Sequence, residues 1–338
     1  MDNRLLTVIF LLNISIIFSQ NNVIPIVEEG IAYHDRGEFD KAIEIYKTAL
    51  EIDPESAMVF YEIGLSYYHK GDYKAAIKYY DKVLKKNEKY LLPATINKGL
   101  SLDNLGKSKA ALKLFKRAVN EFKNEPRLHY NLGYQYYQKD DMENAIREVS
   151  KSIELDPEYS TSHLLMGFLQ FSQNNRVQAL LSYHYFLLLE PGSDRAEGAF
   201  YDINSIMGGN ISVAEDDPKS INISLSANLN SEFSASELLL ALLVAQNNEK
   251  KNKDKTEEEL FIENTTKFFK HLGELKADNN NPRGIYWNLY IPFFEGLAES
   301  GHMTAYFHHI TENIIEDSAV WIENHTIEMF AFEKWLDR

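Results

Sequence analysis

The 338-residue sequence contains no cysteine. This absence excludes disulfide frameworks, thiol nucleophiles, iron–sulfur clusters and cysteine-ligated zinc, so a metal would need histidine and carboxylate ligands. The sequence also lacks a GxSxG elbow, a phosphate-binding Walker loop and a glycine-rich dinucleotide turn. We therefore expect no catalytic residues, no cofactor and no small-molecule substrate.

Positive charge is scarce, with 35 lysines and arginines against 50 aspartates and glutamates and a formal net charge of −15. This balance argues against a nucleic-acid partner bound through a whole-surface positive field. The charge is also uneven, because residues 21–193 carry 22 basic and 24 acidic side chains, whereas residues 194–338 carry 12 and 25. The change near residue 194 indicates a domain boundary. With 44% apolar residues, the composition is that of a folded globular chain.

Residues 1–20 have the pattern of an export signal. Arg4 precedes a largely apolar run, Leu5–Phe18, and small polar residues follow it. As a helix this run would span about 21 Å, which is short of the ~30 Å core of a bilayer. We predict a signal peptide over residues 1–20, a mature chain starting near Gln20 or Asn21, and a periplasmic or extracellular protein with at most peripheral membrane contact. The alternative is an uncleaved anchor or a buried helix.

A repeat of 34 or 35 residues follows the signal. A glycine recurs at this spacing, an alanine follows each glycine by twelve residues, and a bulky apolar residue follows each alanine by four. The glycines are Gly30, Gly64, Gly99, Gly133 and Gly167, the alanines are Ala42, Ala76, Ala111, Ala145 and Ala179, and the bulky residues are Tyr46, Tyr80, Phe115, Val149 and Tyr183. Each copy predicts two helices joined by a turn, at Gly37, Gly71 and Gly106 in the first three copies and at Asp140 and Asn174 in the last two.

The strings EEGIAYHDRGEFDKAIEIYKTALEIDP and YEIGLSYYHKGDYKAAIKYYDKVL resemble the tetratricopeptide repeat (TPR) family, and the resemblance covers residues 23–193. It implies an all-α fold, an α-solenoid of five TPR helical hairpins followed by a second, acidic helical module. The five repeats would occupy residues 23–56, 57–90, 92–125, 126–159 and 160–193. A hairpin alone cannot bury its apolar face, so the copies are expected to stack.

The resemblance implies that the first helix of each repeat lines a concave groove that holds a peptide or a partner helix. Offsets of −3, +1, +4 and +5 from each glycine select the residues that share this stripe. The candidate groove residues are Tyr61, Leu65, Tyr68, His69, Tyr130, Tyr134, Tyr137, Phe168 and Phe171. An aromatic groove suits an apolar or proline-containing segment, and the lack of lysines disfavours a clamp for a terminal carboxylate. The alternative is that these rings pack between repeats or against the C-terminal half.

A second candidate surface is basic. Offsets of +10, +14 and +18 from the glycines place basic side chains on the outer face of the second helices. They are Lys74, Lys78, Lys82, Lys109, Lys113, Arg117, Arg147 and Lys151. This stripe could steer an anionic partner, or it could simply keep a convex face solvated.

The C-terminal half is predicted to be helical. We expect a capping helix at 194–207, a linker at 208–234 with one short strand that lacks a partner, and a helical module at 235–338. The expected helices of the module are 236–246, 256–275 with a capping box at its start, 285–300 with Pro292 as its candidate break, 303–315 and 318–336.

The candidate metal ligands near the C-terminus are His302, His308, His309, Glu312 and His325. His308 and Glu312 are four residues apart and would share a helix face, but the sequence has no second spaced pair and no HExxH signature, so no metal site is predicted. The working hypothesis is an exported, non-enzymatic scaffold that binds a protein or peptide through the groove. Two alternatives stay open: an enzyme with its site in the C-terminal module, or a closed subunit whose groove is self-occupied.

Overall fold

The computed structural model describes residues 23–85, 89–208, 211–214, 217–223, 232–248, 252, 254–278 and 283–338. The chain divides into two compact units, a first unit that ends at Gln135 and a second unit that begins at Tyr136. The predicted export signal lies outside the described residues. Among the residues described, no helix is both long enough and apolar enough to span a bilayer.

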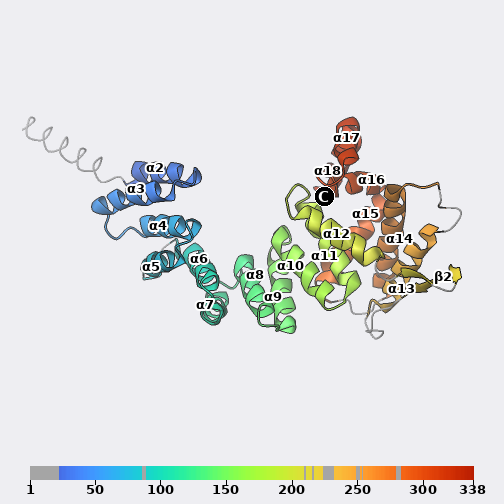
Figure 1. The fold of residues 1–338 in the computed structure, drawn as a ribbon, viewed down its shortest axis with the longest axis horizontal. Helices are drawn as coiled ribbons and strands as arrows, with labels where there is room; N and C mark the ends of the chain where they lie inside the picture. Colours follow the sequence, from blue (N-terminus) through green and yellow to red (C-terminus); the bar gives the residue numbers. More distant parts are fainter. Residues whose placement is uncertain are drawn as a thin grey trace, which may run out of the picture. The chain divides into compact units, whose positions relative to one another are not determined.

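Five helical hairpins follow one another along the chain, which confirms the predicted all-α repeat fold (Figure 1). The first helices of the hairpins are α2 (Ile24–Asp35), α4 (Ala57–His69), α6 (Leu91–Asn104), α8 (Pro126–Tyr137) and α10 (Ser160–Ser172). The second helices are α3 (Phe39–Ile52), α5 (Tyr73–Val83), α7 (Ser108–Glu121), α9 (Met142–Leu155) and α11 (Arg176–Leu189).

The turn inside each hairpin passes through a left-handed backbone conformation. Gly37, Gly71 and Gly106 have φ values of 77°, 86° and 70°, and Asp140 and Asn174 have φ values of 60° and 59° at the same position of repeats four and five. Glycine has no Cβ that opposes this conformation, and Asp and Asn tolerate it better than most residues. The five predicted turns are therefore confirmed.

The glycine of the first helix lets an aromatic ring of the second helix touch the backbone. A Cβ built on Gly30 would lie 2.2 Å from Cε1 of Tyr46, and one built on Gly99 would lie 2.1 Å from Cζ of Phe115. In repeats one, two, three and five the bulky residue of the repeat pattern is thus the ring that closes the hairpin, whereas repeat four has Val149 at this position.

In the second unit, the helix α11 lies at the centre of a larger helical assembly. Nearly every residue from Arg176 to Leu188 is buried, and α11 contacts α10, α12 (Ala196–Gly208), α13 (Ser234–Ala245) and α16 (Met303–Ile310). The remaining elements of the unit are η1 (Gln246–Asn248), α14 (Glu257–Asp278), the π-helix η3 (Tyr286–Tyr290), α15 (Ile291–Ser300), α17 (Glu316–Asn324) and α18 (Thr326–Leu336). The expected boundary near residue 194 does not coincide with this division, because these helices bury the second helix of repeat five.

Three expectations for the C-terminal half were wrong. The linker strand has a partner, since β1 (Ile211–Ala214) pairs antiparallel with β2 (Asp217–Ile223). The single helix expected at 318–336 is two helices, because the backbone leaves the helical region at His325, with φ −122° and ψ 42°. The helix expected at 303–315 also ends early, at Ile310. Pro292 lies in the first turn of α15, directly after the π-helix, where its missing N–H is tolerated.

Candidate functional site

Exposure of the predicted groove residues depends on their position in the repeat. Three positions before the glycine, Val27 and Ile96 are buried, with 3% and 1% exposed, and the residues of the other three repeats are half-buried. One position after the glycine, three of the five residues are exposed, Ile31 by 37%, Tyr134 by 36% and Phe168 by 43%, whereas the leucines at this position in repeats two and three are half-buried. Within the repeats, the position after the glycine is therefore more open to solvent than the position three residues before it.

In the first unit, Tyr61 belongs mainly to the packing between repeats. Its half-buried ring lies 5.4 Å from Tyr90, and its hydroxyl accepts a hydrogen bond of 3.2 Å from Asn97 Nδ2. Burial raises the pKa of the Tyr61 hydroxyl. For Tyr61 the structure therefore favours the alternative that the ring packs between repeats.

Tyr68 and Leu65 are half-buried, and Tyr68 meets Tyr73 edge-on at 5.6 Å. His69 is exposed, and its ring stacks on Phe39 at 6.0 Å and meets His34 edge-on at 5.1 Å. These side chains leave part of their surfaces open at the end of the first helix.

A polar cluster that the sequence did not reveal lies beside these rings. His34 Nδ1 is 2.8 Å from the hydroxyl of Ser66, and burial together with His69 lowers the pKa of His34. Burial and the nearby charge of Asp35 raise the pKa of Glu62 to about 7. The i to i+4 spacing of Glu62 and Ser66 was visible in the sequence, but their approach to repeat one was not.

The remaining candidate groove residues fall on both sides of the division between the units. Tyr130, in the first unit, is half-buried. In the second unit, Tyr137 meets Phe168 edge-on at 5.3 Å, and Phe171 is half-buried. The Tyr137–Phe168 pair presents apolar area with one hydroxyl at its side, which suits contact with another chain.

The basic residues differ in what they contact. Lys74, Lys78, Lys109 and Lys113 are exposed. The ammonium of Lys82 lies 4.4 Å above the ring of Phe60.

The two basic residues of repeat four are neutralised locally, since Arg147 pairs with Glu148 at 3.0 Å and Lys151 pairs with Glu154 at 3.2 Å. Arg117, in repeat three, lines a cavity of about 410 Å³ with Lys85, Lys98 and the carboxylates Asp81 and Glu121, of which Asp81 pairs with Lys98. The exposed basic surface is thus concentrated in repeats two and three.

The C-terminal helices contact α10 and α11 through one buried polar pair each. His163 Nδ1 is 2.7 Å from the hydroxyl of Tyr290, and His184 Nδ1 is 2.7 Å from the hydroxyl of Tyr306. Burial lowers the pKa of His163 to about 4 and that of His184 to about 3. The sequence showed these histidines within apolar helices but not their partners, which lie more than a hundred residues away. This packing leaves Phe168 exposed.

Three of the candidate metal-ligand histidines are engaged in contacts within the fold. His308 Nδ1 is 3.1 Å from the Ser318 hydroxyl, His309 Nε2 donates to the Leu188 carbonyl at 2.9 Å, and His325 Nδ1 donates to the Trp321 carbonyl at 2.8 Å. Within the described part of the chain, no three histidine or carboxylate side chains gather as metal ligands would.

Three family models match the sequence: one described as TPR repeat at residues 30–71, and two described as tetratricopeptide repeat at residues 57–90 and 96–160. Together with the hairpins above, these matches show that the chain contains tetratricopeptide repeats between residues 30 and 160. Such repeats are generally non-enzymatic interaction modules, and stacked repeats form extended concave binding surfaces.

Several solved structures are similar to this chain. MamA from Desulfovibrio magneticus is 24% identical, with 51% of this chain and 97% of that chain covered and a TM-score of 0.43. YrrB, described as a TPR protein with an unusual peptide-binding site, is 23% identical, with 56% and 97% covered and a TM-score of 0.41. PilF from Pseudomonas aeruginosa is 22% identical, with 55% and 88% covered and a TM-score of 0.45. No curated protein matches the chain.

Proposed function

We propose that the protein is a non-enzymatic scaffold that binds a protein or peptide segment through the first helices of its repeats. The observation that carries this proposal is that three of the five apolar residues one position after the repeat glycine are exposed: Ile31 and Tyr134 in the first unit and Phe168 in the second. Repeat proteins use this kind of surface for recognition. Apolar side chains that recur at one repeat position differ from singly scattered exposed residues, which need no explanation.

The preferred ligand is an apolar or proline-containing segment. Tyr137 and Phe168 offer rigid rings that lose little entropy on binding. Across the five repeats, no lysine occupies the stripe positions where a terminal carboxylate would be held. The exposed lysines of α5 and α7 lie on the second helices, where they could add electrostatic steering.

We also propose that the protein is exported, on the basis of the apolar run in residues 1–20. Determination of the N-terminal sequence of the protein purified from its host tests this proposal. A chain that begins near Gln20 or Asn21 supports it, whereas a chain that retains Met1 contradicts it.

Selection of peptides from a random displayed library on the chain from Asn21 onward tests the binding proposal. The affinities of selected peptides are then compared by fluorescence anisotropy. We expect Phe168→Ala to weaken binding by about tenfold, since loss of an aromatic contact costs on the order of 1–2 kcal/mol. The matched control is Phe330→Ala, which removes a 65% exposed ring from α18, outside the repeats. Equal binding by the parent and by a Phe168→Ala, Tyr134→Ala double variant would contradict the proposal.

A further inference from the structure

A cavity of about 370 Å³ in the second unit has an aromatic wall. Phe200 of α12, Phe261 of α14 and Phe307 of α16 line it, and their rings follow one another at 5.7 Å and 5.3 Å. Aromatic faces carry partial negative charge, so such a wall attracts a cation as well as apolar groups.

The same cavity is lined by three carboxylates from two elements. Glu257 and Glu258 belong to the first turn of α14, and Asp317 belongs to the first turn of α17. No lysine or arginine lines the cavity, and none forms an ion pair with these three carboxylates among the described residues. The cavity therefore holds negative charge without a neutralising base.

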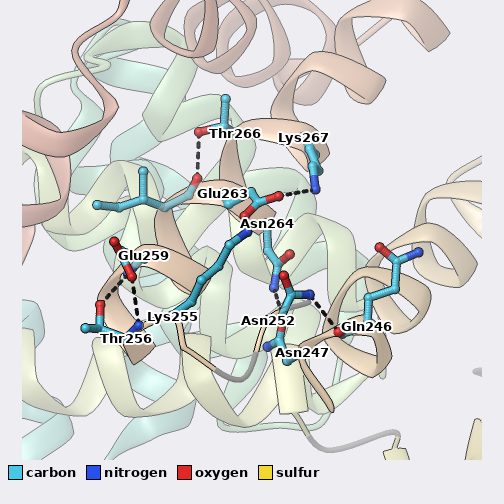
Figure 2. Close-up of polar contacts among 11 residues, drawn as sticks. Gln246, Asn247, Asn252, Lys255, Thr256, Glu259, Glu263, Asn264, Thr266 and Lys267 are labelled. Carbon is cyan, nitrogen blue, oxygen red and sulfur yellow. Dashed lines mark hydrogen bonds and ion pairs between the residues drawn. The ribbon is translucent and has the colours of Figure 1, made fainter. Parts of the chain in front are cut away.

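The nearby polar side chains are committed to other partners (Figure 2). Lys255 and Lys267 both pair with Glu263, and these contacts lower the pKa of Glu263 to about 2. Glu259 forms a capping box with Thr256, with bonds of 2.8 Å and 3.1 Å. The neighbouring lysines are thus held away from the cavity, and of the three successive glutamates only Glu259 caps the helix.

A buried histidine behind the cavity has an unused ring nitrogen. His308 is 2% exposed and its Nε2 makes no hydrogen bond among the described residues; Glu258 Oε1, which lines the cavity, lies 3.3 Å away. Burial lowers the pKa of His308 to about 4, so the ring is neutral near pH 7 and does not neutralise Glu258. Burial and the charges of Glu259 and Asp317 raise the pKa of Glu258.

We infer that this acidic aromatic cavity binds the ammonium or guanidinium group of a lysine or arginine side chain from a partner protein. The aromatic wall and the three carboxylates are complementary to such a group in both charge and polarity. A second cavity of about 280 Å³ shares Glu257 and Phe261 with the first and is also lined by Met207, Val244 and Leu260. A protein segment can place an apolar side chain there beside its basic residue, whereas a free amine cannot.

The test uses the full chain and fluorescein-labelled peptides of the sequence Gly-Leu-Lys-Leu-Gly, with arginine, norleucine or glutamate in place of lysine. At low ionic strength we expect the lysine and arginine peptides to bind about tenfold more tightly than the norleucine peptide. Spermidine is the competing free amine. If spermidine displaces the lysine peptide at a concentration equal to or lower than that of the peptide, the assignment of a protein partner is overturned.

Variants connect the binding to the cavity. Glu258→Gln and Asp317→Asn should each weaken the lysine peptide by about fivefold, and Phe200→Leu, which keeps apolar volume but removes the ring face, should weaken it by a similar factor of about fivefold. The control is Glu274→Gln, an exposed carboxylate farther along α14. Unfolding midpoints from tryptophan fluorescence verify that each variant is folded. Equal loss in the control, or unchanged binding in all three cavity variants, would show that the cavity is not the site.

Discussion

Gly99 and Phe115 are in direct contact, so that a methyl group on Gly99 would lie 2.1 Å from Cζ of the ring. Tyr46, Tyr80 and Tyr183 stand against their glycines in the same way. The ring is fully buried, and neither helix can move away without opening its contacts to the neighbouring repeat.

We expect Gly99→Ala to lower the free energy of unfolding of the first unit by about 1–3 kcal/mol, because the added methyl overpacks a closed hairpin. Gly198→Ala is the control: Gly198 lies inside α12 and its Cβ would meet nothing within 4 Å, so alanine should stabilise that helix by about 0.5–1 kcal/mol. Urea unfolding followed by circular dichroism measures both. Repeat four has Val149 at the position that Phe115 occupies in repeat three. If Phe115→Val restores the stability that Gly99→Ala loses, overpacking against the ring is confirmed as the cause.

Phe168 and Leu169 are adjacent on α10 but differ in exposure, at 43% and 0%. Leu169→Ala should cost about 2–5 kcal/mol of unfolding free energy, whereas Phe168→Ala should cost under about 1 kcal/mol. Chemical denaturation of both variants separates the two cases. A large loss for Phe168→Ala would mean that its ring supports the fold rather than a binding surface.

Among the described residues, the hydroxyl of Tyr306 is the hydrogen-bond partner of the buried His184 ring, at 2.7 Å from Nδ1. Tyr306→Phe leaves Nδ1 without that partner and should lower the stability of the second unit by about 1–3 kcal/mol. Tyr201→Phe removes a hydroxyl from a side chain that is 72% exposed, and it should change stability by less than about 0.5 kcal/mol. Tryptophan fluorescence is a selective probe, since Trp287, Trp321 and Trp335 all lie in the second unit.

The buried histidines predict acid sensitivity of the second unit. Burial lowers the pKa of His163 to about 4 and of His184 to about 3, from 6.5 in the unfolded chain. Below pH ~6.5 the unfolded chain therefore binds protons that the folded unit does not, and stability should fall by up to about 1.4 kcal/mol per pH unit for each histidine. Urea midpoints from tryptophan fluorescence at pH 7 and pH 5 measure this slope. His184→Gln should reduce it, and a slope unaltered by that change would point to other groups.

Glu62 predicts the opposite trend in the first unit. Burial, with a smaller effect of Asp35, raises its pKa from 4.5 to about 7. The folded state then binds a proton that the unfolded chain has lost, so this contribution is complete below pH 4.5 and disappears as the pH rises through 7. Glu62→Gln should make the first unit more stable than the parent at pH 8, with a smaller difference at pH 5. The transition seen by circular dichroism but not by tryptophan fluorescence reports this unit. A variant less stable than the parent at pH 8 would contradict the prediction.

The repeat fold was predictable because its determinants are local. The spacing of glycine and alanine marks the crossing of two helices in one hairpin, and Asp140 and Asn174 mark turns that need a left-handed residue. The capping box of Thr256 and Glu259 was equally local. The pairing of β2 was missed because its partner strand β1, which begins a few residues earlier, shows little apolar alternation. The break at His325 was missed because the apolar pattern continues through it.

The sequence by itself determined the five hairpins, their turns and the residues that share one face of each first helix, since these depend on helical periodicity within some 34 residues. The tertiary structure alone decided that Tyr61 packs toward Tyr90 while Phe168 stays open, and that His163 and His184 meet Tyr290 and Tyr306. It also placed Asp317 of α17 and Glu258 of α14 at the same cavity. Such pairings join residues far apart in the chain, and no local pattern specifies which distant surface covers a given side chain.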